Sequence, residues 1–176
     1  VFSIFMNLKR EKDNWDNSLD LGYGLLKQGE QGFRKTDDKI DLLSKYGRQA
    51  HKGLYYAALF NFKTQMQPGY KYISDVDKEK ISNLFAPAYT LIALGFDYKP
   101  NSYFSAFLAP LTAKFTFVAD EDLSNLGAFG VKPGEKSRSE VGGYIRAIYS
   151  RNDFKNEFMK NVSFTTKIDL FSNYAN

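Results

Sequence analysis

The sequence has no cysteine, only one histidine and no apolar run of about 18 residues. The lack of cysteine excludes disulfides, thiolate metal sites and cysteine nucleophiles, and the lack of a long apolar run excludes a transmembrane helix. Proline is also scarce, with 5 in 176 residues, whereas 16% of the chain is aromatic, including 16 Phe and 12 Tyr. Because aromatic residues favour strands, this composition favours β-structure over helix.

No strong charge of one sign is present either. The chain carries 24 basic and 20 acidic residues, which gives a net charge of +4, and the two signs are interspersed. A nucleic-acid-binding surface would instead require a basic stripe, so no nucleic acid is expected as a partner. Neither a repeat nor a low-complexity linker divides the sequence, and a single domain over residues 1–176 is therefore expected.

What the sequence does contain is alternation. Between Trp15 and Leu26, apolar and small or polar residues alternate with a period of two, which is the pattern of a two-faced strand. The length is about that of a tilted strand crossing a bilayer, and a barrel keeps its mean hydropathy modest because only alternate residues meet lipid. The mean hydropathy of −0.43 is compatible with such a protein. The feature predicts a membrane-spanning β-barrel.

The same analysis predicts eight strands along the chain. They are Val1–Leu8, Trp15–Leu26, Asp38–Tyr46, Leu54–Met66, Ala88–Tyr98, Tyr103–Val118, Arg138–Tyr149 and Asn161–Tyr174. Short links alternate with three longer loops, Lys27–Asp37, Gln67–Pro87 and Ala119–Ser137, as in outer-membrane barrels. The fold class expected is thus an all-β, antiparallel, up-and-down transmembrane β-barrel or the larger part of one. Pro110 predicts a bulge in its strand or a position that needs no backbone donor, and a hidden tight turn is the alternative.

The two faces of these strands differ in chemistry. One face carries Leu, Ile, Phe and Tyr and would meet lipid, whereas the other carries acids and bases in near balance and would line the lumen. Aromatic residues near the short links, such as Trp15 and Tyr46, fit an interfacial belt. Confined charges are most stable when paired, so one mixed-sign structural network is predicted in the lumen. It comprises Lys39, Asp41, Lys45, Lys63, Arg138, Glu140, Arg146, Lys167 and Asp169.

Residues with catalytic potential are few. His51 lies beside Arg48 and Lys52 in a polar link and has no neighbouring nucleophile pattern, which favours a solvated residue over a base or ligand. Acidic groups at Asp37–Asp38 and Asp120–Asp122 could hold a hard cation, but they lack the spacing of a calcium loop. Neither a catalytic residue nor a metal or cofactor site is therefore predicted, and the protein is expected not to be an enzyme.

Six segments together resemble one protein family. They are Phe33–Gly47, Asn61–Tyr70, Phe85–Asn101, Ala109–Val118, Leu126–Ala147 and Asn161–Tyr174. The sequence resembles a family of Bacteroidetes-type outer-membrane β-barrel proteins that is classed as a domain of unknown function. Members of that family look longer at both ends, so this chain is expected to be a fragment of one, since Val1 opens within a strand and Asn176 replaces a terminal aromatic residue. The resemblance implies a fold and a location in the outer membrane of a Gram-negative bacterium, with no activity to transfer.

These observations lead to one expectation and two alternatives. The expectation is a non-enzymatic structural or accessory component of the envelope, in contact with outer-membrane lipid and, by analogy, with a larger outer-membrane complex. A diffusion pore or transport channel is the first alternative, and a soluble lipocalin-like barrel that binds an apolar ligand is the second. The sequence identifies no small-molecule substrate and no cofactor.

Overall fold

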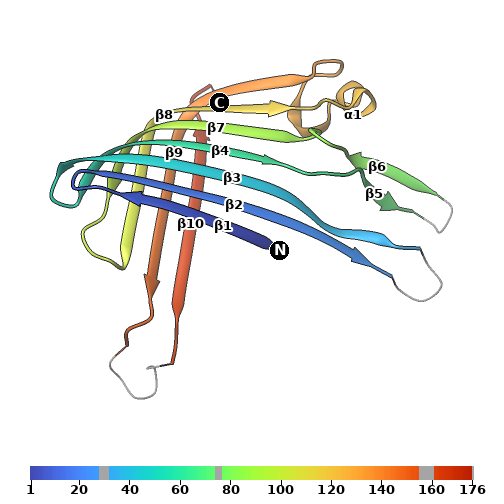
Figure 1. Cartoon of the computed structure of the whole chain (residues 1–176). Helices are drawn as coiled ribbons and strands as arrows, with labels where there is room; N and C mark the ends of the chain where they lie inside the picture. Colours follow the sequence, from blue (N-terminus) through green and yellow to red (C-terminus); the bar gives the residue numbers. More distant parts are fainter. Residues whose placement is uncertain (28–31, 74–76, 155–160, 176) are drawn as a thin grey trace.

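The chain folds into one large antiparallel sheet whose strands follow each other in an up-and-down order. The computed structural model describes residues 1–27, 32–73, 77–154 and 161–175. The spatial order is β1-β2-β3-β4-β7-β8-β9-β10, and the sheet curls into an open half-barrel (Figure 1). The strands are β1 (Phe2–Lys9), β2 (Asp13–Leu26), β3 (Arg34–His51), β4 (Leu54–Thr64), β7 (Ala88–Tyr98), β8 (Phe104–Phe117), β9 (Ser137–Arg151) and β10 (Phe164–Asn173).

All eight predicted strands are present, most with ends within two or three residues of those expected. The largest difference is β3, which continues through most of the predicted link Gly47–Gly53 and leaves only Lys52 and Gly53 between strands. Gly53 has a φ of 76°, a left-handed conformation that glycine adopts without strain. The link between β9 and β10 lies partly outside the described residues.

The sheet is open rather than closed. In the described part of the chain, β1 pairs only with β2, and β10 pairs only with β9. The described residues therefore form an open half-barrel, whereas the sequence led to the expectation of a whole barrel or the larger part of one. The prediction of an all-β, antiparallel, up-and-down sheet is confirmed.

A bulge beside Pro110 bends the sheet. Strand β8 runs without a turn through this proline, and the register with β9 shifts between Ala109 and Thr112. A second shift, between Leu94 and Phe96, lies next to it in the pairing of β7 with β8. The predicted bulge is confirmed, and the tight turn is excluded. Because a bulge exchanges the two faces of a strand, Phe107 lies on the concave face, whereas strict alternation along β8 would put it on the same face as Leu111.

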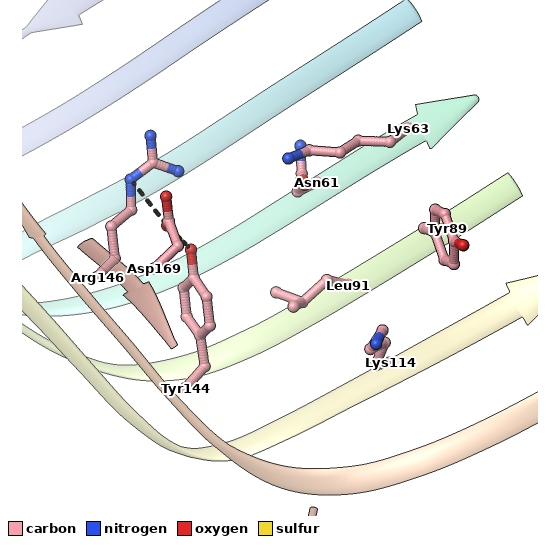
Figure 2. A pocket seen from close by; sticks show the side chains of 8 residues that line it. All are labelled: Asn61, Lys63, Tyr89, Leu91, Lys114, Tyr144, Arg146 and Asp169. Carbon is pink, nitrogen blue, oxygen red and sulfur yellow. Dashed lines mark hydrogen bonds and ion pairs between the residues drawn. The ribbon is translucent and has the colours of Figure 1, made fainter. Parts of the chain in front are cut away.

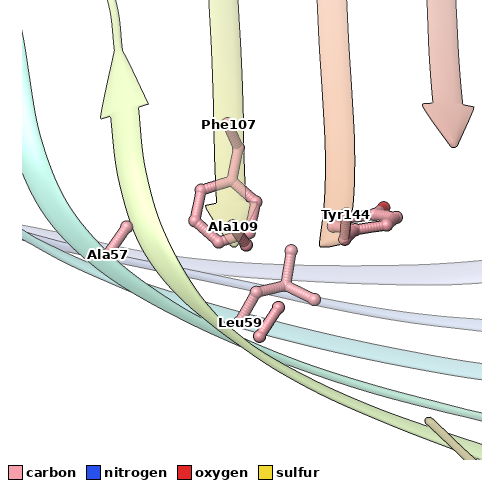
Figure 3. Close-up of a cluster of buried hydrophobic side chains, with 6 residues drawn as sticks. Ala57, Leu59, Phe107, Ala109 and Tyr144 are labelled. Atoms are coloured by element: carbon pink, nitrogen blue, oxygen red, sulfur yellow. The ribbon is translucent and has the colours of Figure 1, made fainter. Parts of the chain in front are cut away.

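A small apolar cluster fills the concave side at this bend (Figure 3). Leu59 from β4, Phe107 from β8 and Tyr144 from β9 converge there, and Phe107 is only 1% exposed. The smaller side chains of Ala57, Ala93 and Ala109 complete the cluster. This packing joins β4 to β9 across the inside of the curve.

The longer connections gather at one end of the sheet (Figure 1). They contain elements that the sequence did not predict, namely the hairpin of β5 (Gly69–Tyr72) and β6 (Lys78–Ser82), the helix α1 (Glu121–Asn125) and the 3-10 turn η1 (Ala128–Gly130). A second apolar cluster of Ala86, Val118, Leu123 and Val131 packs α1 against the sheet end. Within the described residues, no helix is both long and apolar enough to span a membrane.

Candidate functional site

The concave face of the sheet carries most of the charged strand residues, and register places opposite charges side by side. Asp41 on β3 lies opposite Lys63 on β4, and Lys114 on β8 lies opposite Glu140 on β9. On the last two strands, Asp169 lies opposite Arg146. Such directly opposed pairs of unlike charge stabilise an antiparallel ladder. The charges divide into two groups.

The first group, here called the balanced cluster, lies toward the short links. Lys45 Nζ is 2.7 Å from Asp97 Oδ2, and the Asp97 side chain is only 3% exposed. Lys99 Nζ lies 3.3 Å from the same carboxylate and 3.8 Å from Asp16. Ser105 Oγ donates a 3.0 Å hydrogen bond to the other oxygen of Asp97. Two cations thus face two carboxylates, and the buried acid is fully engaged.

The second group, here called the cationic cluster, extends along β3, β4, β8, β9 and β10. Lys63 Nζ lies 3.5 Å from Asp41, and Lys114 Nζ lies 3.8 Å from Glu140. These two ion pairs are longer than a charge-assisted hydrogen bond, which is normally 2.7 to 2.9 Å. Glu140 forms a shorter contact of 2.9 Å with Arg138.

The third acid of the cationic cluster is shared among three donors. Asp169 accepts a hydrogen bond from the hydroxyl of Tyr144 and lies 3.7 Å from Arg146 (Figure 2). It also lies 3.3 Å from Lys167. The cationic cluster therefore contains five basic and three acidic side chains. They are Lys63, Lys114, Arg138, Arg146 and Lys167 with Asp41, Glu140 and Asp169.

A pocket of about 310 Å³ opens within the cationic cluster. In Figure 2, Leu91 lies near its centre, between Lys63 and Asn61 on one side and Lys114 on the other. Tyr89 closes one end and the Tyr144, Arg146 and Asp169 group closes the other. The pocket thus combines an apolar floor with hydrogen-bond donors around its rim.

The nine predicted lumen residues all lie in the sheet, but their ionic contacts do not join them into one group. Lys45 belongs to the balanced cluster, and Lys39 makes no ion pair with any residue that the structure describes. The other seven belong to the cationic cluster. They are Asp41, Lys63, Arg138, Glu140, Arg146, Lys167 and Asp169.

The sequence-based set omits Asp97, Lys114, Tyr89 and Tyr144. Alternation places Asp97 and Lys114 on the charged face, but only the register shows that Asp97 faces Lys45 two strands away. Tyr144 follows two glycines, where alternation alone does not reveal a hydrogen bond to Asp169. The signal that could identify these residues is cross-strand pairing, which requires the register of the whole sheet.

The convex face has the opposite chemistry. Large apolar side chains project from every strand of the sheet and stay exposed, among them Leu94 at 48%, Leu111 at 59% and Leu170 at 57%. Two polar residues on this face are bonded to each other, since Ser44 Oγ donates a 2.7 Å hydrogen bond to Asn17 Oδ1. Trp15 Nε1 in turn donates to Ser44 Oγ at 2.9 Å. The convex face is therefore apolar, and these polar groups are satisfied within it.

The acidic groups noted in the sequence do not form a metal site in the described part of the chain. Among the described residues, no three His, Asp or Glu side chains converge as a metal site. Of the acidic groups noted in the sequence, Asp120 contacts Lys80 Nζ at 2.7 Å and accepts a hydrogen bond of the same length from Asn83. The hydrogen bond from Lys80 is the main reason that the pKa of Asp120 falls to about 2. This acid serves as a structural anchor for α1, whose Leu123 N–H it caps.

Comparison with known proteins gives a family match for the N-terminal part of the chain. Residues 1–70 match a family described as "Protein of unknown function (DUF3078)". The DUF3078 match spans β1 to β4 and ends at the start of β5. It includes Lys45 of the balanced cluster and Asp41 and Lys63 of the cationic cluster, and it excludes the other residues of the cationic cluster. No curated protein and no solved structure matches the chain.

Proposed function

We propose that the protein is a non-enzymatic β-barrel component of a Gram-negative outer membrane, with a structural or accessory role in the envelope. The observation that carries the proposal is the division of chemistry between the faces, with exposed Leu, Ile and Phe on the convex side and paired charges on the concave side. A charge in hydrocarbon costs a few kcal/mol, so a barrel keeps its charges inside.

The aromatic residues at the short-link end support the same placement. Trp15 and Tyr46 lie opposite each other in register, and Tyr56 packs against Phe96 with 5.7 Å between ring centroids. Tyr98 on β7 is also 47% exposed. Exposed Trp and Tyr at strand ends are typical of the interfacial belts of membrane barrels. The short-link end would accordingly lie at the periplasmic interface.

The chemistry of the concave face also helps to decide between a membrane barrel and the soluble lipocalin-like barrel. A lipocalin-like barrel would line its inner surface with apolar residues to bind an apolar ligand. Here the inner surface carries Lys45, Asp97, Arg146 and Asp169, whereas Leu94 and Leu170 project outward. This arrangement favours the membrane over the soluble barrel. A pore is the second candidate, because a charged concave surface with a pocket would face an aqueous lumen in a larger barrel.

Cell fractionation tests the proposal. The full-length protein, separated by sucrose gradient after gentle lysis, is expected in the outer-membrane fraction and to migrate faster on gels before heating than after it. Recovery in the soluble fraction without detergent would contradict the proposal. Planar-bilayer recording then separates the two membrane functions, because a structural component gives no steady conductance, whereas a pore does.

A further inference from the structure

The concave face carries a local excess of positive charge at its pocket. The balanced cluster pairs two cations with two carboxylates, whereas the cationic cluster has five basic groups for three acids. On the neighbouring strands, Lys39, Asp20 and Asp37 also carry charge on this face, but none of them lines the pocket. The pocket lining itself contains three basic side chains, Lys63, Lys114 and Arg146, and one acid, Asp169. The pocket lining therefore carries two more positive than negative charges, and the acids Asp41 and Glu140, which lie outside the lining, contact Lys63 and Lys114 only at 3.5 and 3.8 Å.

The ammonium groups of Lys63 and Lys114 have N–H donors available for a ligand. Neither donates a hydrogen bond to a described residue, and their ion pairs of 3.5 and 3.8 Å are long. Their side chains are 52% and 33% exposed, respectively. Lys114 also lies near the rings of Tyr89 and Phe171, at 6.0 and 5.4 Å from their centroids. Cations held in this way can approach a ligand without breaking a short ion pair.

The spacing of the two lysines suits a ligand with two anionic groups. Lys63 lies on β4 opposite Tyr89, and Lys114 lies on β8 opposite Leu91. Strand β7 runs between them, and their partners on it are two residues apart, so their backbones are roughly 12 Å apart. Both side chains border the space above Leu91 (Figure 2). A short apolar segment between two anions would lie on Leu91 and the Tyr89 ring.

We propose that this pocket binds a small dicarboxylate, with one carboxylate at Lys63 and the other at Lys114. A dianion would balance the excess of two positive charges in the pocket lining, and charge-assisted hydrogen bonds from both ammonium groups would hold it. The pocket volume of about 310 Å³ accommodates a ligand of this size. The proposal rests on the concave face alone and does not depend on where the convex face lies.

Titration calorimetry of the full-length protein with succinate tests this inference. Saturable binding is expected, with succinamide, its uncharged analogue, showing none and acetate binding at least tenfold more weakly. Lys63→Gln and Lys114→Gln should each weaken succinate binding roughly tenfold, the loss typical of one charge-assisted hydrogen bond. Lys39→Gln is the matched control, because Lys39 lies on the same face outside the pocket lining, and it should change the affinity less than twofold.

The result that would overturn the proposal is equally specific. Absence of saturable succinate binding up to about 10 mM, binding of succinamide as tightly as succinate, or equal losses in all three variants would contradict it. Each variant is checked for an unchanged urea midpoint first. Lys63→Arg and Lys114→Arg keep the charge and should retain most of the affinity, so a loss caused by misfolding is distinguished from a loss of charge.

Discussion

The ring of Phe107 packs edge-on against the ring of Tyr144, with 6.2 Å between their centroids, on the concave side of the sheet. Simple alternation along β8 places Phe107 with Leu111 and Phe115 on the opposite face. The shift of register next to Pro110 reverses this assignment, so Phe107 is almost fully buried whereas Leu111 is exposed. One bulge thus converts an outward aromatic residue into a central contact of the inner cluster.

Phe107→Ala should lower the free energy of unfolding by about 3 to 5 kcal/mol, because it leaves a cavity between Leu59 and Tyr144. Phe115→Ala is the matched control on the convex face of the same strand. Its cost should be smaller, since lipid or solvent fills the space that the ring leaves. Urea unfolding of the refolded variants measures both, and equal costs would show that Phe107 does not have the inner position.

Gly95→Ala should be strongly destabilising, because its added Cβ would lie 2.0 Å from the carbonyl oxygen of Leu108. This close approach occurs at the register shift, where β7 and β8 bend together. The cost is expected to reach about 1 to 3 kcal/mol or more, as in other overpacked sites. Gly47→Ala is the control on the same face, with its nearest atom 3.7 Å away, and should change the urea midpoint little. A tolerated Gly95→Ala would argue against the bend.

The sequence is informative about strands and faces but not about the bend or the loops. Period-two alternation reflects burial on one side of a sheet, so it identifies all eight strands and the apolar face. The exchange of faces at Phe107 depends on which residue of β9 pairs with β8, and alternation within one strand carries no such information. The β5–β6 hairpin and α1 are short and are stabilised by contacts such as that of Lys80 with Asp120. These residues are far apart in the sequence, so no local sequence pattern predicts the contact.

Leu94→Arg tests the lipid contact of the convex face. At mid-strand, it should destabilise a barrel refolded in lipid vesicles by roughly 2 to 4 kcal/mol, and Leu8→Arg, near the strand end, by at most about 1 kcal/mol. The two leucines are almost equally exposed, at 48% and 46%, so burial within the protein does not separate them. If the convex face met water, both substitutions would stay within about 0.5 kcal/mol, and urea titration would show no dependence on depth.

Removing one partner of the Lys45 and Asp97 pair should be costly. Asp97→Ala leaves the ammonium of Lys45 without its 2.7 Å partner in a largely buried position, and a loss of about 3 to 5 kcal/mol is expected. The exposed pair Lys132 and Glu135, 3.9 Å apart, is the control, and Glu135→Ala should cost less than about 1 kcal/mol. The double variant that combines Asp97→Ala with Lys45→Met should be more stable than Asp97→Ala alone. Losses that add up in the double-mutant cycle would contradict direct coupling between the two residues.

The candidate site, like the fold, can be predicted from the sequence only in part. Charge patterning places Lys63, Arg146 and Asp169 on one face, but it does not divide that face into a balanced and a cationic cluster. The division depends on cross-strand distances, such as 2.7 Å for Lys45 to Asp97 against 3.8 Å for Lys114 to Glu140. Those distances arise from register and bend, which are properties of the whole sheet.

The docking of α1 at the sheet end should depend on pH through Asp120. Its pKa is lowered to about 2, chiefly by the hydrogen bond from Lys80, and the carboxylate also caps Leu123 N–H at 3.2 Å. A carboxyl whose pKa is lower in the folded state stabilises that state above its unfolded pKa of about 4 and loses this contribution as pH falls toward 2. Amide hydrogen exchange at Leu123 and Ser124 should therefore accelerate, beyond its intrinsic pH dependence, as the pH is lowered from 4 to 2.

Asp120→Asn is the control for this acid response. The amide keeps a hydrogen-bonding oxygen but carries no charge, so α1 should be less protected at neutral pH, and its protection should be nearly constant from pH 4 to pH 2. Asp122→Asn removes the more exposed carboxylate that Lys80 also contacts, at 2.8 Å, and should leave the acid response in place. If the acid response persists in Asp120→Asn, another carboxyl controls the docking, and the anchoring role of Asp120 is wrong.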